Sequence, residues 1–278
     1  MTGGSQEGAR NQREGLHVMS TVDPGPAARA PSAARSQGRQ LYVLVHGAWH
    51  GGWCWARVAE RLRAAGHRVF TPTLTGLGDR AHLIGPNVGL GTFIEDVVST
   101  IDMEDLSDVV LVGHSFGSAV ISGVADARPD LIRRLVFLDS FVVQSGQSPF
   151  NQLPKEMVEA RRASPIKTPG LYGETLAMPP PAPSAFGITD AKDAAWVTSR
   201  LRPHPIKSYE DRLELKRPLG AGRPKTYIAC TNPNYRANAA ARQWVQAQPD
   251  WTYFELATGH DAMVLAPDAL TEMLTREA

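Results

Sequence analysis

Residues 109–117 read VVLVGHSFG, and this stretch constrains the fold more than any other part of the chain. Its first four residues are all apolar, as expected of a strand buried on both faces. Two glycines then enclose Ser115 in the pattern G-x-S-x-G, and a helix-like segment follows to Arg128. A serine in this setting indicates a turn so sharp that its neighbours can carry almost no side chain. We predict a strand, a tight turn and a helix, with Ser115 Oγ exposed at the C-terminal edge of a sheet; a helix-capping serine is the alternative.

Strand-like and helix-like segments alternate along most of the chain after residue 40. We expect strands at residues 41–45, 67–72, 109–112, 135–139, 225–230 and 251–256, and helices at 53–65, 92–105, 117–128, before 244 and from 267. The helix at 92 opens with the pattern of a capping box, in which Thr92 is the N-cap and Glu95 its partner. Such alternation predicts crossover connections, and therefore an α/β fold with a mostly parallel sheet and helices on both faces.

Two segments depart from this alternation. Residues 141–223 contain many prolines between short helical pieces, which makes the segment too long for a loop and too broken for a sheet. We predict that it is a helical cap, inserted between core segments 40–140 and 224–278. Residues 1–39 are rich in Gly, Ala, Ser, Gln and Arg and nearly free of large apolar side chains, which predicts a disordered tail.

Composition narrows the classes of partner and cofactor. Lys and Arg number 29 against 28 Asp and Glu, so charge gives no reason to expect a nucleic acid or an anionic membrane as partner. No apolar run is long enough for a membrane span or a secretory signal, and we expect a cytoplasmic protein. Cys54 and Cys230 are expected to be buried thiols. The spacing of residues indicates no metal site, phosphate loop or dinucleotide-binding motif, so we expect neither metal nor cofactor. The sequence does not decide between a monomer and a homodimer.

The motif around Ser115 requires further groups if the serine is a nucleophile. A serine hydroxyl needs a base to take its proton, and His260 lies in the loop ATGHDAM after the last expected strand, in the chain order of nucleophile and then histidine. A tetrahedral intermediate also needs donors for its oxygen. We expect the backbone N–H groups of Phe116, directly after the serine, and of Ala48, in the turn HGAW after the first strand.

Four segments, LVHGAWHGGWCW, LTGLGDRAHL, LVGHSFG and TGHDAM, resemble the α/β-hydrolase superfamily. More narrowly, the chain resembles bacterial carboxylesterases of the pyrethroid-hydrolase kind, which are related to plant methylesterases and hydroxynitrile lyases. The resemblance implies a cofactor-free serine esterase that cleaves an ester of a small, fairly apolar molecule through an acyl-enzyme. The plant lyases carry a threonine and a lysine where this chain has Gly47 and Asp261, which favours an esterase over a lyase.

The acid of the expected triad departs from the pattern of the plant relatives. In those relatives an aspartate follows the strand equivalent to TYIAC, where this chain has Asn232 and Asn234. Neither amide can carry the negative charge that stabilises an imidazolium. Asp139 ends the expected strand LVFLD, where some other α/β-hydrolases keep their acid, and we predict that it orients His260. A capping role at the strand end is the alternative for Asp139.

The aromatic residues Trp49, Phe186 and Trp196 are candidates for an apolar substrate pocket, although packing alone could explain them. Two other functions fit the same scaffold. One is lyase or cofactor-free oxygenase chemistry, and the other is a ligand receptor that has kept the pocket without catalysis. Fold by itself does not choose among them.

Overall fold

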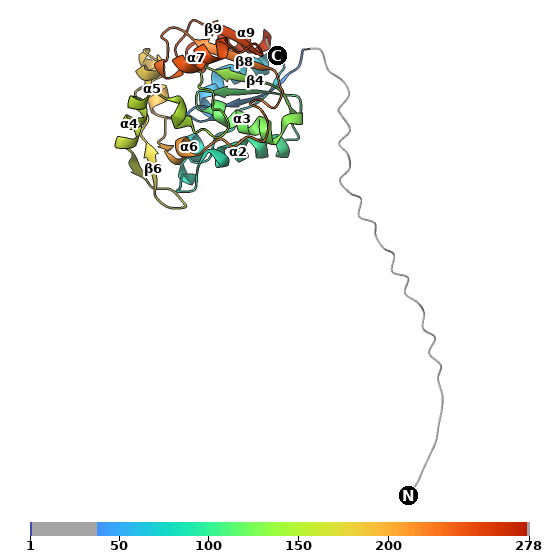
Figure 1. The fold of residues 1–278 in the computed structure, drawn as a ribbon, viewed down its shortest axis with the longest axis vertical. Helices are drawn as coiled ribbons and strands as arrows, with labels where there is room; N and C mark the ends of the chain where they lie inside the picture. The colour runs from blue at the N-terminus through green and yellow to red at the C-terminus, as the bar shows by residue number, and fades with distance from the viewer. Residues whose placement is uncertain (2–37, 277–278) are drawn as a thin grey trace. The chain divides into compact units, whose positions relative to one another are not determined.

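The computed structural model describes Met1 and residues 38–276. The tail predicted for residues 1–39 therefore lies outside the described residues, except for Met1, Gly38 and Arg39. All the helices and strands described below belong to one unit, residues 37–278 (Figure 1).

Six parallel strands form the central sheet, in the order β2-β1-β3-β4-β8-β9. The strands are β1 (Leu41–Val45), β2 (Arg68–Phe70), β3 (Val109–His114), β4 (Ile132–Leu138), β8 (Lys225–Cys230) and β9 (Trp251–Leu256). Each expected strand is present, and the prediction of an α/β fold is confirmed. In the register of the sheet Gly113 lies opposite Val45 on one side and Phe137 on the other. The turn after β3 is therefore flanked by the ends of β1 and β4.

Helices cover both faces of this sheet (Figure 1). They are α1 (Ala56–Ala64), α2 (Leu90–Met103), α3 (Gly117–Ala127), α7 (Ala239–Gln246), α8 (Ala262–Leu265) and α9 (Pro267–Arg276). Helix α2 packs on α3, and α1 packs on α9. Helix α3 is buried over nearly its whole length, which accounts for its small and apolar residues.

The proline-rich cap segment (141–223) contains helices α4 (Lys155–Ala163), α5 (Ala191–Thr198) and α6 (Lys207–Glu210). It also contains an antiparallel sheet of β5 (Ile166–Thr168), β6 (Thr175–Met178) and β7 (His204–Pro205), in the order β5-β6-β7. The expectation that this segment is too broken for a sheet is therefore wrong. Strands of two to four residues between prolines are too short to show an alternating pattern in the sequence.

The start of α2 also differs from the prediction. The helix begins at Leu90, with Gly89 as its N-cap, so Thr92 is not the cap. Thr92 instead lies in the first turn, where its Oγ1 accepts the N–H of Gly89 at 3.3 Å. The N–H of Leu90 donates to Asp211 Oδ2 at 2.9 Å, across 121 residues of sequence. A helix cap supplied by so distant a residue cannot be read from the local sequence pattern.

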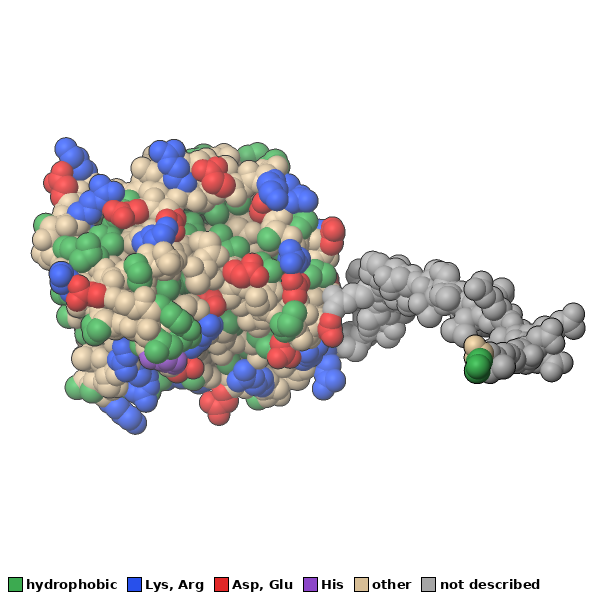
Figure 2. Space-filling model, turned by 90° about the horizontal axis from the view of Figure 1, so that it is seen from below, with side chains coloured by type: hydrophobic (Ala, Val, Ile, Leu, Met, Phe, Trp, Pro, Cys, Tyr) green, Lys and Arg blue, Asp and Glu red, His purple; other side chains and the backbone are tan. Residues whose placement is uncertain are grey.

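Several surface and core features agree with the composition. Cys54 and Cys230 are free and buried, as predicted. None of the described helices has the length and apolar character needed to cross a membrane. Figure 2 shows Lys and Arg side chains interspersed with Asp and Glu over the face in view.

We predict that Asp211→Ala lowers the free energy of unfolding by about 1 kcal/mol, because the first N–H of α2 loses its acceptor. The midpoint of urea unfolding measures the change. Asp130, which is exposed and lies 3.4 Å from Arg223, provides the matched control, and Asp130→Ala should change stability by less than about 0.5 kcal/mol. Equal effects of the two substitutions would show that Asp211 does not cap the helix.

Candidate active site

The turn between β3 and α3 holds Ser115 in a left-handed backbone conformation, with φ of 52°. Residues other than glycine seldom adopt this conformation, and it persists only where the surrounding structure enforces it. The two flanking glycines allow close packing. A Cβ atom at Gly113 would lie 2.7 Å from the carbonyl oxygen of Gly117, and one at Gly117 would lie 2.8 Å from that of Val45. The G-x-S-x-G pattern is thus a steric requirement of this turn.

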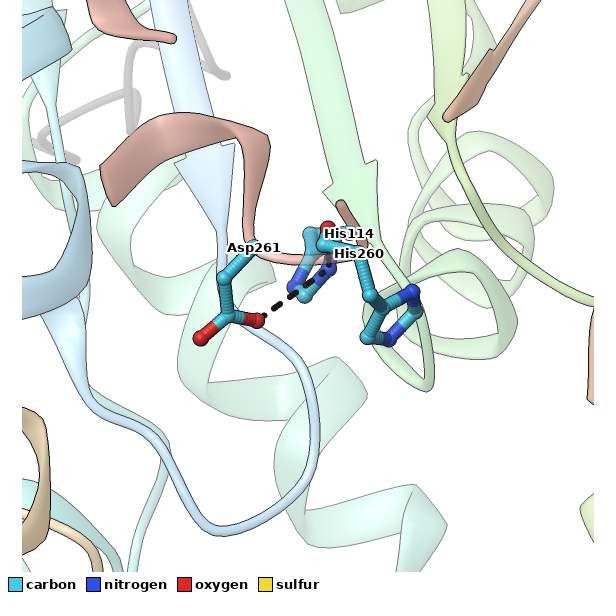
Figure 3. Close-up of side chains that lie close together, drawn as sticks. All are labelled: His114, His260 and Asp261. Carbon is cyan, nitrogen blue, oxygen red and sulfur yellow. Dashed lines mark hydrogen bonds and ion pairs between the residues drawn. The ribbon is translucent and has the colours of Figure 1, made fainter. Parts of the chain in front are cut away.

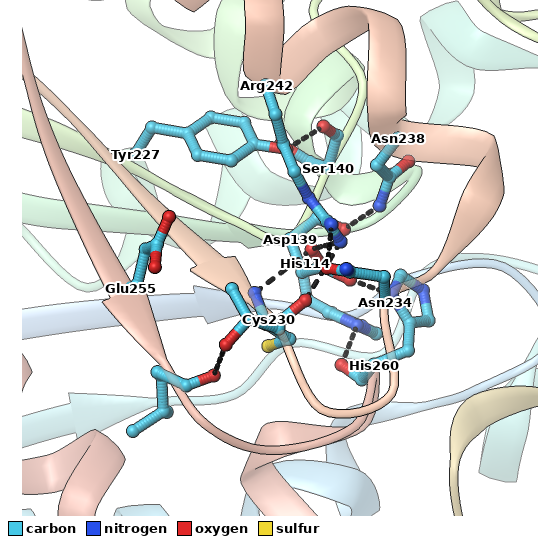
Figure 4. Close-up of polar contacts among 12 residues, drawn as sticks. His114, Asp139, Ser140, Tyr227, Cys230, Asn234, Asn238, Arg242, Glu255 and His260 are labelled. Atoms are coloured by element: carbon cyan, nitrogen blue, oxygen red, sulfur yellow. Dashed lines mark hydrogen bonds and ion pairs between the residues drawn. The ribbon is translucent and has the colours of Figure 1, made fainter. Parts of the chain in front are cut away.

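His260 and Asp139 come together from loops that follow two different strands. Asp139 follows β4, and its N–H donates to the carbonyl of Ile228 in β8 at 2.7 Å. Its Oδ2 lies 2.6 Å from Nδ1 of His260, and both side chains are buried (Figure 4). The contact predicted between these residues is therefore present. Asn234, the alternative position, accepts a hydrogen bond from Arg242 instead.

Arg242 is a partner of Asp139 that the sequence did not reveal. Its Nη2 donates to Asp139 Oδ1 at 2.8 Å, and the same oxygen accepts the N–H of Cys230 at 3.1 Å. Burial alone would raise the pKa of Asp139, but the hydrogen bond and charge of His260 and the guanidinium of Arg242 hold it below its ordinary value. In sequence Arg242 looks like any solvent-facing arginine of an amphipathic helix, because its target is 103 residues away.

The hydrogen bond to Asp139 also orients the ring of His260. Nδ1 must carry the proton that faces a carboxylate, which leaves Nε2 free to act as a base. The ring of Tyr235 stacks on His260 at a centroid distance of 3.9 Å and an angle of 20°. Among the described residues Ser115 Oγ has no hydrogen bond to His260. Such bonds are often long before substrate binds.

The two backbone donors expected for an oxyanion lie beside Ser115. A Cβ atom at Gly47 would be 2.9 Å from the Cβ of Ser115, so only glycine lets the first turn approach the serine this closely. Within residues 38–276 the N–H groups of Ala48 and Phe116 have no acceptor, whereas that of Trp49 donates to His204 Nδ1 at 3.3 Å. Ala48 and Phe116 therefore keep donors available for a ligand.

A second buried histidine–aspartate pair ties the first turn to the loop that carries His260. His50 Nε2 lies 3.0 Å from Asp261 Oδ2, and His50 Nδ1 lies 2.7 Å from the carbonyl oxygen of Ala48. Burial opposes charge on His50, but the negative charge of Asp261 and these hydrogen bonds raise its pKa above the ordinary value. Burial likewise opposes charge on Asp261, yet the charge and hydrogen bond of His50 lower its pKa. We interpret the two residues as an ion pair.

His114, His260 and Asp261 place ligand-type atoms within 4.8 Å of one another (Figure 3). Their hydrogen bonds argue against a metal centre. His114 Nε2 lies 3.1 Å from the carbonyl oxygen of His260, and His260 Nδ1 is held by Asp139. Burial lowers the pKa of His114 to about 3, so its ring is neutral and Nε2 carries the proton that this carbonyl accepts. We interpret the group as the packed interior of the active site.

An apolar cavity of about 340 Å³ lies next to these residues. It is lined by Trp49, Met157, Ala160, Arg161, Ser164, Met178, Pro179, Pro181, Ala185 and Tyr235. Of the three predicted pocket residues, Trp49 lines the cavity. Phe186 is buried against the rings of His50 and His260, with distances between ring centroids of 5.2 and 6.1 Å. Trp196 is not among the residues that line this cavity, and its ring centroid lies 5.1 Å from that of Trp53.

We predict that Asp139→Asn lowers kcat for a 4-nitrophenyl ester by about 10³- to 10⁴-fold, because an amide cannot stabilise the imidazolium form of His260. Asn234→Ala is the control, because it removes the other side chain that accepts a hydrogen bond from Arg242. It should change kcat by less than about threefold. A comparable loss in both variants would show that the charge of Asp139 is not what matters.

We predict that Asp261→Asn lowers the free energy of unfolding by about 3 kcal/mol at pH 6, because a buried cation loses its partner. The stability that His50 contributes is present below its unfolded pKa of about 6.5 and is lost as pH rises through its raised folded value. The difference from the parent protein should therefore be smaller at pH 9. Urea unfolding at both pH values measures it.

The control for this comparison is Asp193→Asn, which removes a partly exposed pair with Arg57. We expect it to cost less than about 1 kcal/mol at both pH values. An Asp261→Asn effect that does not change between pH 6 and pH 9 would contradict the assignment of an ion pair.

Comparison with known proteins places this arrangement in a family. The alpha/beta hydrolase family matches residues 42–273. The chain is 42% identical to a carbendazim hydrolyzing esterase of Nocardioides sp. (strain SG-4G), over 84% of this chain and 97% of the relative. It is 30% identical to methylesterase 2 of Arabidopsis thaliana, over 85% of this chain and 95% of that relative. An extracellular alpha/beta-hydrolase from a Paenibacillus species has a similar structure, with a TM-score of 0.71 and 26% identity over 85% of this chain and 98% of that one. The resemblance seen in the sequence is thus confirmed, and the chain belongs to the alpha/beta hydrolase family.

Proposed function

We propose that this protein is a serine carboxylesterase that works through an acyl-enzyme. Its family and its esterase relatives make it a carboxylic ester hydrolase. The observation that supports the serine mechanism best is the 2.6 Å contact between His260 Nδ1 and Asp139 Oδ2, in a buried site beside the strained turn of Ser115. Together these residues have the chemistry of a nucleophile, a base and an acid that orients the base.

In the proposed reaction Ser115 Oγ attacks the ester carbonyl carbon while His260 Nε2 takes the hydroxyl proton. The N–H groups of Ala48 and Phe116 hold the oxygen that becomes negative. The intermediate collapses when the C–O bond to the alcohol breaks, and His260 gives the proton to the leaving alkoxide. Water then attacks the acyl-enzyme by the same route, releasing the carboxylic acid and restoring Ser115. Asp139 stays ionised and stabilises the imidazolium of His260 in both steps.

The cavity supports a small and fairly apolar ester as substrate. Its walls are mostly apolar, with Trp49 next in sequence to Ala48 and Tyr235 stacked on His260. A volume of about 340 Å³ is at the lower end of the range for ligand pockets. We further propose a cytoplasmic protein, since two free thiols suit a reducing compartment. A small-molecule ester is the proposed partner, with no nucleic acid or membrane, and a homodimer is compatible with this proposal.

We predict that 4-nitrophenyl butanoate gives a burst of 4-nitrophenolate followed by a slower steady state when deacylation limits turnover. Ser115→Ala should reduce turnover by about 10⁴-fold or more, because the members of a triad act as a unit. Ser199→Ala, at an exposed serine on the cap segment, is the control and should keep activity and melting temperature. Residual activity of Ser115→Ala within tenfold of the parent would contradict the assignment of Ser115 as the nucleophile. Tight ligand binding without turnover would point to a receptor instead.

A further inference from the structure

Arg161 is a charged residue in the wall of the otherwise apolar cavity, and neither the catalytic site nor the sequence motifs account for it. It lies on α4 of the cap segment, and its guanidinium carbon is 5.3 Å from the ring centroid of Trp49 and 5.1 Å from that of Tyr209. Contacts of this length between a guanidinium and aromatic rings are attractive. The rings thus fix the position of the charged group, and the hydroxyls of Tyr209 and Tyr235 also interact with it.

One N–H group of the guanidinium has no partner. Nη1 of Arg161 is buried and makes no hydrogen bond within the described residues, and no acidic side chain there pairs with Arg161. The adjacent Arg162 differs, because its Nη2 lies 3.8 Å from Glu210 and its guanidinium rests on Phe150 at 4.9 Å. A buried donor without an acceptor is costly, and more so when it is charged. A position of this kind therefore favours a ligand that supplies the acceptor.

The place of Arg161 relates it to the substrate of the proposed esterase. Arg161, Trp49 and Tyr235 line one cavity. Trp49 follows the oxyanion donor Ala48, and Tyr235 stacks on the ring of His260 at 3.9 Å. An ester with its carbonyl at Ser115 and its body in the cavity would therefore extend along Trp49 toward the guanidinium.

We propose that the substrates are esters that carry a second oxygen acceptor, a carboxylate, at the end remote from the scissile bond, and that Arg161 binds it. This inference rests on the proposed function and names its substrate class. A carboxylate fits better than a neutral carbonyl because it both accepts from Nη1 and balances a guanidinium charge that no acidic side chain of the described residues balances. Apart from Ser164 and Tyr235 the rest of the wall is apolar, which suits a short hydrocarbon or aromatic body between the two polar ends.

The test compares matched esters with and without the carboxylate. One pair varies the acyl side, 4-nitrophenyl hydrogen glutarate against 4-nitrophenyl pentanoate. The other varies the alcohol side, 4-carboxyphenyl butanoate against 4-methylphenyl butanoate. For each pair, the ratio of kcat/KM values is measured in the parent protein and in Arg161→Gln. We expect the substitution to lower this ratio by about 10- to 100-fold in at least one pair, the range for a hydrogen bond to a charged group. The neutral esters should change by less than about threefold.

Arg162→Gln is the matched control, since it removes the neighbouring charge outside the cavity wall, and it should leave both ratios unchanged. Ratios that stay within threefold in Arg161→Gln, or that fall equally in Arg162→Gln, would overturn the proposal. Binding separates this inference from the esterase proposal. In Ser115→Ala, calorimetry with methyl hydrogen glutarate and with 4-carboxyphenyl butanoate should show, for at least one of the two esters, a Kd that rises about tenfold when Arg161→Gln is added. An unchanged Kd for both esters would count against Arg161 whether or not esters are hydrolysed.

Discussion

The carboxylate of Asp139 is the group on which the proposed active site depends. It is buried, and it accepts hydrogen bonds from His260 Nδ1, from Arg242 Nη2 and from the N–H of Cys230. A buried carboxylate is stable only when several donors surround it, and here the donors lie 91, 103 and 121 residues beyond Asp139 in sequence. The same contacts hold the charge that His260 needs and lock its ring in one tautomer. The charge and hydrogen bond of Arg242, with those of His260, hold the pKa of Asp139 below its ordinary value although burial opposes this.

The parallel sheet explains why these groups meet. The turn with Ser115 follows β3, Asp139 follows β4, and the loop with His260 follows β9, so all three leave the same edge of the sheet. Asp139 follows β4, which is the direct neighbour of β3 and its serine turn. The asparagines follow β8, which is one strand further from β3. From the end of β4 the carboxylate of Asp139 reaches His260 at 2.6 Å without any acid after β8.

The sequence was sufficient for features that local physics determines. The sheet follows from apolar runs such as 41–45 and 109–112, the serine turn from its glycines, and His260 from the loop after the last strand. The contact of Asp139 with His260 could be expected once the asparagines were seen to lack a charge. Other features depend on residues brought together by the fold. Asp211 caps α2 across 121 residues, Arg242 reaches Asp139 across 103, and no local pattern encodes either contact.

The cap segment supplies parts that the core cannot make alone. His204 accepts the N–H of Trp49 in the first turn, next to Ala48, the proposed oxyanion donor. Asp211 fixes the start of α2, and Arg161 brings charge to the cavity. In the mechanism proposed above, the core supplies the attack on the ester carbonyl, since Ser115, His260 and Asp139 follow its strands. The cap segment provides most of the cavity wall, so in the same proposal it selects the rest of the ester. The proposal thus places chemistry and selectivity in different segments, so that the lining residues of the cap segment could change while the contact of Asp139 with His260 stayed the same.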